Sequence, residues 1–325
     1  MLNLSVVIPD YKSSFLDQTI ESVLLINPDE IIISNFRTSY TESLEKKYKD
    51  NEKIKFLNFD SRKNPGDYRN CGAERASKKY ILFVDSDILI NEKTIKFIDN
   101  NLKNVDEEKI FWGVYATSSK NNIFQDIQIK VLRYRCSEKF FNLAKKNNKP
   151  YCGQSSHFII TRELFNKLGG FNPYLRMRED NDFCIRAKLI GAKNILYNDF
   201  EASHLKKFEI INDYFVKPYH SVKVKILEPK IFNQPYSQIG KSLFFQWFIC
   251  PIIFALTAIF LKDKINFINI IFAYLLILYL TIPRFLKKSF NFIEKLLYIF
   301  LCPVIGLNFI IGGLSGLVHG VIIKI

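Results

Sequence analysis

The sequence predicts an α/β protein with a mostly parallel, Rossmann-like sheet, followed by an all-α transmembrane region. Three observations lead to this prediction. Short apolar runs alternate with helical patterns over residues 4–205, two carboxylates close one of these runs, and the last third carries long uncharged segments. Alternating strands and helices are typical of βαβ units, and strands buried on both faces have continuous apolar sequences.

The apolar runs of the first part have strand length, and the segments between them have helical spacing. Breaks such as Asn27-Pro28-Asp29 and Gly169-Gly170 separate them. Residues 111–115 form a less regular stretch, and residues 179–188 have the pattern of an amphipathic helix. The expected strands are residues 6–9, 30–33, 54–58, 80–84 and 153–161, and the expected helices are residues 15–25, 41–49, 68–76, 91–103 and 162–168.

Two aspartates follow the buried run Tyr80–Val84 and are separated by one serine. Open α/β sheets bind ligands beyond the carboxyl ends of their strands, so Asp85 and Asp87 should face a cleft. Carboxylate oxygens bind hard divalent cations, which in turn hold nucleotide phosphates. An Asp-x-Asp pair alone also fits a solvated turn, so the assignment depends on the other motifs.

A second group of acids, Glu179, Asp180 and Asp182, opens the amphipathic pattern near residue 179. Acidic residues in the first turn of a helix are favoured by the helix dipole, and capping alone accounts for Asp180 or Asp182. Three carboxylates within four positions nevertheless repel one another unless cations or chemistry separate them. The cluster is therefore a candidate catalytic group.

The charge of the chain is concentrated in its apolar part. Of a formal net charge of +14, a net +9 lies from Lys206 onward, where 14 basic and 5 acidic residues occur. Basic residues beside apolar segments indicate an anionic membrane surface, whereas a nucleic-acid partner favours a basic stripe on a soluble domain. Membrane lipids are the expected partners, and nucleic acid is not.

Three uncharged runs in the last third are long enough to cross a bilayer, for which about 20 apolar residues suffice. They are residues 243–261, 265–283 and 296–323. The separator at residues 284–295 is more basic than the one at residues 262–264, so the positive-inside rule places it in the cytoplasm. The expected domains are a catalytic domain at residues 1–205, an interfacial amphipathic connector at 206–241 and about three transmembrane helices at 242–325.

The N-terminus and the cysteines point to a reducing compartment. Residues 1–9 have no basic leader, and the six cysteines include no Cys-x-x-Cys pair. Disulfides and a zinc site are not expected. We therefore predict an integral membrane protein of the cell membrane with a cytoplasmic catalytic domain.

Several motifs now recur together in a recognisable order. They are Val7-Ile8-Pro9, Tyr68-Arg69-Asn70-Cys71-Gly72, Phe83-Val84-Asp85-Ser86-Asp87, Gly169-Gly170-Phe171, Glu179-Asp180-Asn181-Asp182 and His204. Over roughly residues 4–205 the chain resembles family 2 glycosyltransferases of the GT-A fold. This resemblance implies transfer of a sugar from a nucleotide diphosphate donor with a divalent cation, Mg²⁺ or Mn²⁺, usually with inversion at the anomeric centre.

The resemblance also implies roles for single residues on the donor side. Asp85 would hold the diphosphate and the metal, Asp87 would contact the metal directly, and His204 would join the metal or the phosphates. The other donor-binding residues are Pro9, Asp10 and Tyr11 around base and ribose, and Arg69 near the phosphates.

On the acceptor side, Asp180 would be the general base. Glu179 and Asp182 would support it, and Arg186 would balance the charge.

Two departures from the family pattern narrow these expectations. The acid that usually contacts the nucleoside after the second strand is replaced by Ser34 or Asn35. The identity of the donor's nucleobase therefore stays undetermined. No Gln-x-x-Arg-Trp follows the acidic cluster, so we expect transfer of one or a few sugars rather than processive synthesis.

The sequence therefore predicts a membrane-anchored hexosyltransferase of cell envelope polysaccharide biosynthesis, acting on a lipid-linked saccharide at the cytoplasmic face. A polyprenyl-phosphate acceptor is the alternative. A non-catalytic scaffold that binds nucleotide sugars is another alternative. A degenerate metal site would have favoured it, but both acids, Asp85 and Asp87, are present. A transporter is disfavoured because the apolar runs contain no acid or arginine.

Overall fold

The computed structural model describes residues 2–106, 108–115, 153, 155–175 and 178–206, together with the isolated positions 123, 130, 292, 293 and 295. The chain divides into two compact units. One comprises Met1–Lys120 and Arg135–Lys207, and the other comprises Asn121–Tyr134 and Phe208–Ile325. Nearly all described residues belong to the first unit, which holds the sheet and the candidate site.

The first half of this unit alternates strands and helices, as the sequence predicts. Its four strands are mutually parallel in the order β3-β2-β1-β4. The elements are β1 (Leu4–Asp10), α1 (Leu16–Leu24), β2 (Glu30–Phe36), α2 (Ser39–Lys47), β3 (Ile54–Phe59), α3 (Pro65–Arg75) and β4 (Tyr80–Val84).

The second half continues the sheet on the far side of β4. Strand β7 pairs antiparallel with β4 and β6, β6 pairs parallel with β8, and β8 pairs antiparallel with β5. The elements are β5 (Ile88–Ile90), α4 (Glu92–Asn101), the 3-10 turn η1 (Leu102–Asn104), β6 (Lys109–Tyr115), β7 (His157–Thr161), α7 (Arg162–Lys167), α8 (Glu179–Leu189) and β8 (Lys193–His204).

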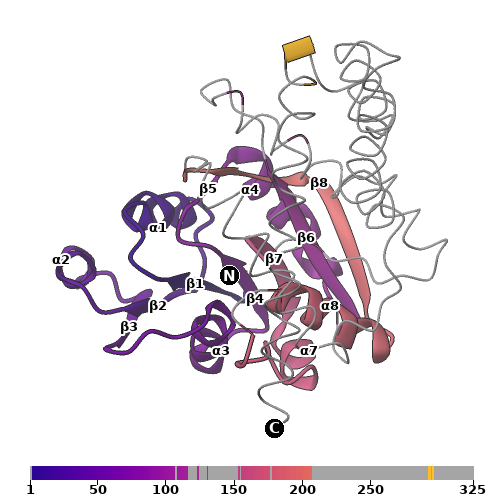
Figure 1. Ribbon diagram of the computed structural model, residues 1–325, viewed down its shortest axis with the longest axis horizontal. Helices are drawn as coiled ribbons and strands as arrows, with labels where there is room; N and C mark the ends of the chain where they lie inside the picture. The colour runs from indigo at the N-terminus through magenta and orange to yellow at the C-terminus, as the bar shows by residue number, and fades with distance from the viewer. Residues whose placement is uncertain are drawn as a thin grey trace, which may run out of the picture. The chain divides into compact units, whose positions relative to one another are not determined.

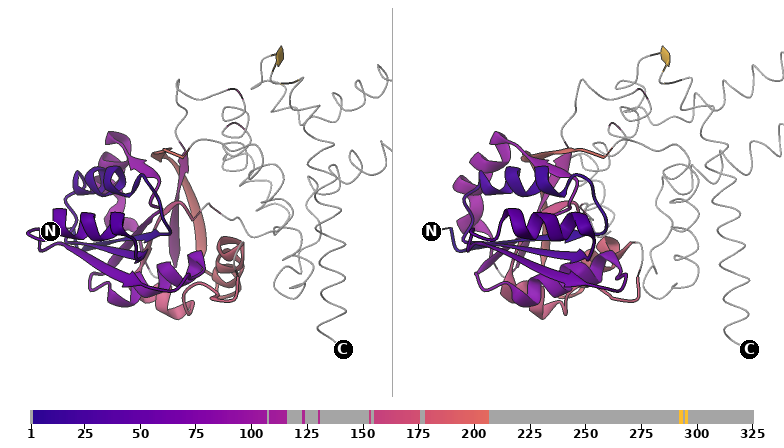
Figure 2. Two further views of the ribbon diagram at one scale, coloured as in Figure 1. Left: turned by 60° about the vertical axis from the view of Figure 1, so that its left-hand side comes forward. Right: turned by 90° about the vertical axis from the view of Figure 1, so that its left-hand side faces the viewer.

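Helices cover both faces of the sheet (Figures 1 and 2). Apolar side chains of α1 and α4, with Leu44 of α2, pack on one face, which includes Val6 and Ile8. The other face, which includes Val7, is covered by α3, α7 and α8. Because both faces of β1 and β4 are buried, the polar residues that follow these strands mark an edge of the sheet rather than a face.

Two expectations need correction. The sheet is mixed, because β7 and β5 run against their neighbours, and only the first four strands form a wholly parallel set. The less regular stretch around residues 111–115 is the buried strand β6, and the strand β8 was not predicted. Polar and apolar residues mix in β8, so its pattern gave no strand signal.

The helix starts follow local chemistry. Thr38 caps α2 by accepting from the Thr41 backbone N–H at 3.0 Å, while the Thr41 hydroxyl accepts from Thr38 N–H. Helix α3 begins at Pro65, three residues before the predicted start, because proline is well suited to the first helical turn. Residues 64–67 are thus the cap and first turn of α3 rather than a separate loop.

The carboxylate of Glu30, buried at the start of β2, ties three segments together. It accepts hydrogen bonds from Ser5 Oγ at 2.7 Å, Ser77 N at 2.6 Å and Lys55 Nζ at 3.1 Å. Burial opposes ionisation, but these hydrogen bonds outweigh it and lower the pKa of Glu30 to about 2. The charged form therefore stabilises the fold.

We expect this contribution to disappear in acid. Since the pKa in the folded state is below that of an unfolded glutamate, the stabilisation is present above about pH 4.5 and is lost as the pH falls towards 2. We expect the ionised Glu30 to contribute about 2 kcal/mol to the free energy of unfolding. This is less than the pKa difference alone would give, because its partner Lys55 is half exposed and solvent screens the pair. Urea unfolding between pH 7 and pH 3 measures it, and Glu30→Gln should show a flatter pH dependence. An equally steep dependence in Glu30→Gln would contradict this assignment.

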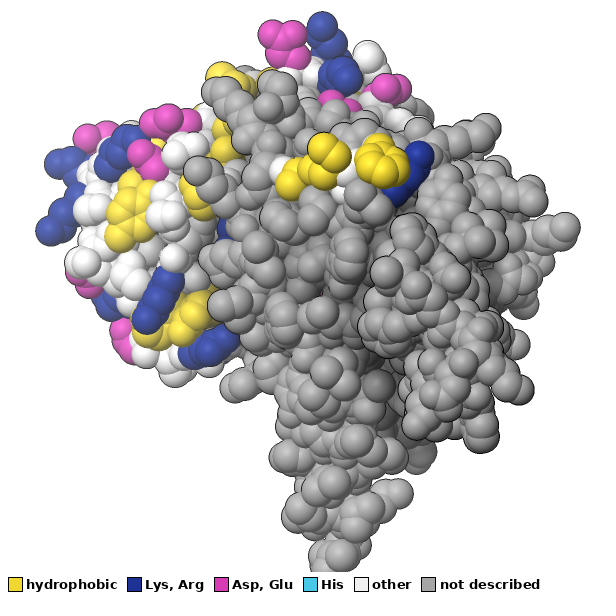
Figure 3. Space-filling model, turned by 45° about the horizontal axis from the view of Figure 1, so that its top comes forward, with side chains coloured by type: hydrophobic (Ala, Val, Ile, Leu, Met, Phe, Trp, Pro, Cys, Tyr) yellow, Lys and Arg dark blue, Asp and Glu magenta, His cyan; other side chains and the backbone are white. Residues whose placement is uncertain are grey.

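Helices long and apolar enough to span a bilayer are not found among the described residues. The three predicted spans and the predicted connector lie outside the described residues. On the described surface that Figure 3 shows, basic and acidic side chains are interspersed.

Candidate active site

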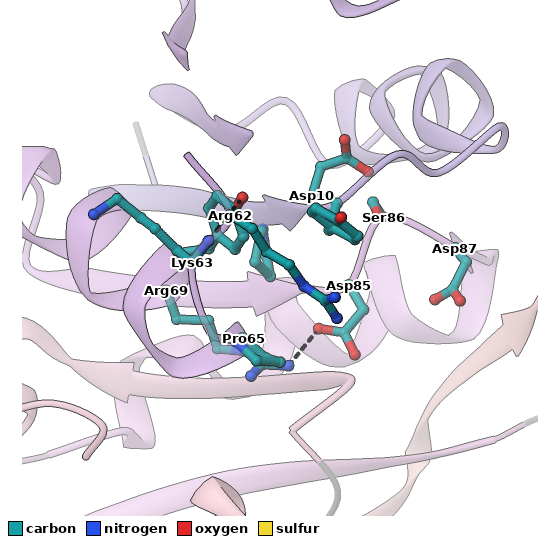
Figure 4. Close-up of a pocket in the computed structure, with 11 residues that line it drawn as sticks. Asp10, Arg62, Lys63, Pro65, Arg69, Asp85, Ser86 and Asp87 are labelled. Atoms are coloured by element: carbon teal, nitrogen blue, oxygen red, sulfur yellow. Dashed lines mark hydrogen bonds and ion pairs between the residues drawn. The ribbon is translucent and has the colours of Figure 1, made fainter. Parts of the chain in front are cut away.

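A pocket of about 220 Å³ lies at the carboxyl ends of β1 and β4 (Figure 4). Such strand ends are where open α/β sheets bind their ligands. The residues that line it come from the β1 end, the β3–α3 loop, the start of α3 and the turn after β4. They are Pro9, Asp10, Tyr11, Arg62, Lys63, Pro65, Tyr68, Arg69, Asp85, Ser86 and Asp87.

The turn after β4 presents both predicted carboxylates to this pocket. The backbone N–H of Asp85 donates to Ser156 O at 2.8 Å, and that of Ile88 donates to Asp85 O at 3.1 Å. Ser86 is buried, whereas the side chains of Asp85 and Asp87 keep 30% and 22% of their surface exposed. The local backbone thus holds the two acids at the pocket surface with the serine between them buried.

Arg69 lies buried between the two acidic motifs. Its Nη2 is 2.6 Å from Asp85 Oδ1, and its Nη1 is 3.0 Å from Glu179 Oε1. Burial alone would lower the pKa of Arg69, but the two carboxylates outweigh it and raise this pKa. The arginine predicted near the phosphates therefore joins the β4 turn to the start of α8, and Arg69 and Glu179 are 110 positions apart in the sequence.

Removing this guanidinium should destabilise the fold strongly. Arg69→Met leaves two carboxylates in a buried site without a counter-ion, which typically costs about 3 to 5 kcal/mol. Urea unfolding at pH 7 measures the loss. Adding Glu179→Gln to Arg69→Met should recover part of it, because one of the two unpaired charges is then absent. If Arg69→Met unfolds with the wild-type free energy, the ion pairs do not stabilise the fold.

His204 lies beside Asp87 because β8 pairs with β5. Ile88 and His204 are register partners, and the Leu205 N–H donates to Asp87 O at 2.8 Å. This pairing leaves His204 Nε2 3.5 Å from Asp87 Oδ2. The Nδ1 atom of His204 lies 3.0 Å from Lys206 O, an acceptor, so Nδ1 carries a proton.

These positions fit a divalent cation. A divalent cation between His204 Nε2 and Asp87 Oδ2 would interact favourably with both atoms. Among the described residues, no three His, Cys, Asp or Glu side chains gather closely enough to hold a metal. Asp87 and His204 would therefore be its direct ligands, Asp85 would lie nearby, and donor oxygens and water would complete the shell.

The three acids at the start of α8 differ in how they are held. Glu179 pairs with Arg69, and Asp182 pairs with Arg186 at 2.7 Å, one helical turn later. Asp180 accepts hydrogen bonds from Asn181, at 2.7 Å from its backbone N and 3.2 Å from its side chain, and the charges of Arg69 and Arg178 also act on it. These hydrogen bonds to Asp180 thus come from neutral donors, whereas Glu179 and Asp182 each pair with an arginine.

Burial acts on two of these acids. It raises the pKa of Asp180, and it also raises the pKa of Glu179 although Arg69 opposes the shift. A carboxylate with a raised pKa is a stronger proton acceptor once ionised. Asp180 does not line the pocket itself, but it follows Glu179, whose partner Arg69 does.

The predicted nucleoside side of the pocket is also present. Pro9, Asp10 and Tyr11 all line it, and Tyr11 is 41% exposed. Burial raises the pKa of Asp10, although hydrogen bonds from Ser86 and Ser13 act to lower it. Asn35, opposite Asp10 in the sheet, is buried, and its Nδ2 donates to Asn58 Oδ1 at 2.8 Å. Asn35, one of the two positions that match the family's acid, therefore forms an amide pair with Asn58 between β2 and β3.

Sequence reasoning missed two cationic residues of the pocket. Arg62 and Lys63 lie in the β3–α3 loop and line it beside Tyr11 and Asp85. Their signal in the sequence was a pair of basic residues directly before Asn64-Pro65-Gly66, at the carboxyl end of a predicted strand.

Comparison with known proteins identifies the family of the chain. A family profile described as "Glycosyl transferase family 2" matches residues 5–169. An "Uncharacterized glycosyltransferase" of Rickettsia bellii (strain RML369-C) is 31% identical over 139 residues, which is 38% of this chain and 20% of that protein. The chain thus matches about a fifth of the length of this curated relative.

Solved structures share the fold at low sequence identity. The mannosyltransferase PcManGT from Pyrobaculum calidifontis, in complex with GDP-Man and Mn²⁺, superposes with a TM-score of 0.63 at 12% identity, over 97% of this chain and 87% of that chain. The crystal structure of GalNAc-T7 with UDP, GalNAc and Mn²⁺ gives 0.49 at 16% identity, over 73% and 52%. The fold is therefore GT-A-like, and with the family profile covering half of its length, the chain belongs to glycosyl transferase family 2.

Proposed function

We propose that this protein transfers a single sugar, or a few, from a nucleotide diphosphate donor to a lipid-linked saccharide, with inversion and with a divalent cation. The observation that carries the proposal is the pocket in which Asp85 and Asp87 follow β4, His204 faces Asp87, and Arg69 connects Asp85 to the acidic start of α8. Arg69 thus links the pocket that would bind the donor to the helix start that would carry the base.

On the donor side, Asp87 and His204 would hold Mg²⁺ or Mn²⁺, with Asp85 beside them. The cation supplies positive charge opposite the diphosphate, where negative charge develops when the sugar leaves. Asp10 and Tyr11 would bind the nucleoside, because both line the pocket at the end of β1.

On the acceptor side, Asp180 would act as general base. The acceptor oxygen forms a bond to the anomeric carbon and gives its proton to Asp180. The bond from this carbon to the β-phosphate oxygen breaks, and its electron pair leaves with the nucleoside diphosphate. A base suits this role when its pKa lies closer to the working pH, as burial provides for Asp180.

The nucleotide and the membrane association rest on separate support. PcManGT was solved with GDP-Man and Mn²⁺, which makes GDP-sugars the first donors to test. The basic, apolar last third of the sequence supports an enzyme of the cell membrane whose catalytic domain faces the cytoplasm. This placement would bring nucleotide sugars and lipid carriers to the same surface.

A transfer assay tests the proposal. Purified full-length protein receives labelled GDP-, UDP- and dTDP-sugars with Mn²⁺ or Mg²⁺, and either a lipid-linked saccharide or a polyprenyl phosphate. Label on the saccharide supports the proposal, and label on the polyprenyl phosphate favours the alternative acceptor. Binding of nucleotide sugars without transfer or hydrolysis would point to a non-catalytic scaffold instead.

A further inference from the structure

Arg62 is an exposed cation at the mouth of the pocket. It lies in the β3–α3 loop, and its guanidinium carbon is 4.6 Å from the centre of the Tyr11 ring. Figure 4 shows its side chain extending across the pocket towards Asp85. An arginine stacked on an aromatic ring keeps its N–H groups directed outward in the plane of the guanidinium.

The two pocket arginines differ in what they already bind. Both terminal nitrogens of Arg69 are engaged by carboxylates, and its side chain is only 3% exposed. Arg62 makes no ion pair with any residue that the structure describes, although it lines the same pocket as Asp85 and Asp87. Of these two arginines, Arg62 is therefore the one available to an incoming anion.

We propose that Arg62 is a donor-binding residue that holds the diphosphate of the donor. This inference rests on the proposed function. Phosphate oxygens suit the planar fork of a guanidinium, and charge-assisted bonds of this kind are roughly twice as strong as neutral ones. Stacking on the Tyr11 ring already restricts the guanidinium of Arg62. Binding the diphosphate therefore costs little further side-chain entropy.

The position of Arg62 has a consequence for turnover. The β-phosphate gains negative charge as the sugar leaves, and a guanidinium at the diphosphate binds that state more tightly than the intact donor. Arg62 would thus contribute to both donor binding and turnover, whereas a residue that only stacks on the base would contribute to binding alone.

The experiment compares a nucleoside diphosphate with its nucleoside. Calorimetry in the presence of Mn²⁺ gives the affinities of UDP, GDP and dTDP for the wild-type protein. The nucleotide that binds most tightly is then used in all later measurements. Displacement of that nucleotide then gives the affinity of the matching nucleoside. The variants are Arg62→Gln and Arg62→Lys, with Arg75→Gln as charge-matched control, because Arg75 is an exposed residue at the far end of α3.

We expect Arg62→Gln to bind the diphosphate about 10- to 100-fold more weakly, the usual effect of losing hydrogen bonds to a charged group. Nucleoside affinity should stay unchanged, Arg62→Lys should lie between, and Arg75→Gln should match wild type. An equal loss for nucleoside and diphosphate, or no loss at all, overturns the inference but leaves the proposed function intact. If wild type binds none of the three diphosphates, the proposed function fails and this inference with it.

Discussion

We expect Asp87→Asn to lower the rate of sugar transfer by about 10²- to 10³-fold, since preorganised charge opposite a leaving group is usually the largest single contribution to such catalysis. The substitution removes the negative charge that faces His204 Nε2 at 3.5 Å while keeping the size of the side chain. An amide oxygen binds a divalent cation more weakly than a carboxylate does, so the diphosphate loses its counter-charge. Steady-state transfer at saturating donor measures the effect.

The control for this variant is Asp99→Asn, which removes the same charge from an exposed position on α4. It should transfer sugar at the wild-type rate. Raising the metal concentration should restore part of the activity of Asp87→Asn if weak cation binding is the cause. A turnover within a few-fold of wild type at ordinary metal concentration would remove Asp87 from the donor site.

Asp180→Asn should bind the donor normally and lose about 10² to 10⁴ in turnover, the range that general-base catalysis contributes. Asp180 neither lines the donor pocket nor pairs with Arg69 or Arg186, so an amide at this position leaves both ion pairs in place. Donor affinity by calorimetry and turnover with a saccharide acceptor give the two values separately.

The acceptor decides how large the effect of Asp180→Asn is. A sugar hydroxyl must lose its proton, whereas a polyprenyl phosphate is already an anion and needs no base. Asp199→Asn, an exposed position on β8, serves as the control. Near-normal turnover of Asp180→Asn on a saccharide would remove Asp180 from the mechanism.

The first half of the fold was predictable because each element carries its own signal. The runs at β1, β2 and β4 are continuously apolar and buried, and the breaks between them are proline or asparagine turns. Strand β8 was not predictable in this way, because Asn194, Asp199 and Glu201 interrupt its apolar residues. Its place is set by pairing with β6 and β5, which are distant in sequence.

The candidate site shows the same division. Asp85, Asp87 and the acids of α8 stand out in the sequence as clustered charges at the ends of elements. The contacts between these groups depend on segments that are distant in sequence. Arg69 of α3 joins Asp85 to Glu179 of α8, and His204 meets Asp87 because β8 pairs with β5. Arg62 was missed because a basic residue in a loop is common, and only the ring of Tyr11 beneath it gives it a fixed place.

The most direct test of the metal-bound donor is thermal unfolding with GDP-, UDP- and dTDP-sugars, each with and without Mn²⁺. A ligand that binds only the folded state at a hundred times its Kd adds about 2.7 kcal/mol of stability. We expect at least one donor to raise the Tm by several degrees only when the metal is present, in wild type and Asp99→Asn but not in Asp87→Asn. No metal-dependent shift with any donor, or an equal shift in Asp87→Asn, would contradict the account.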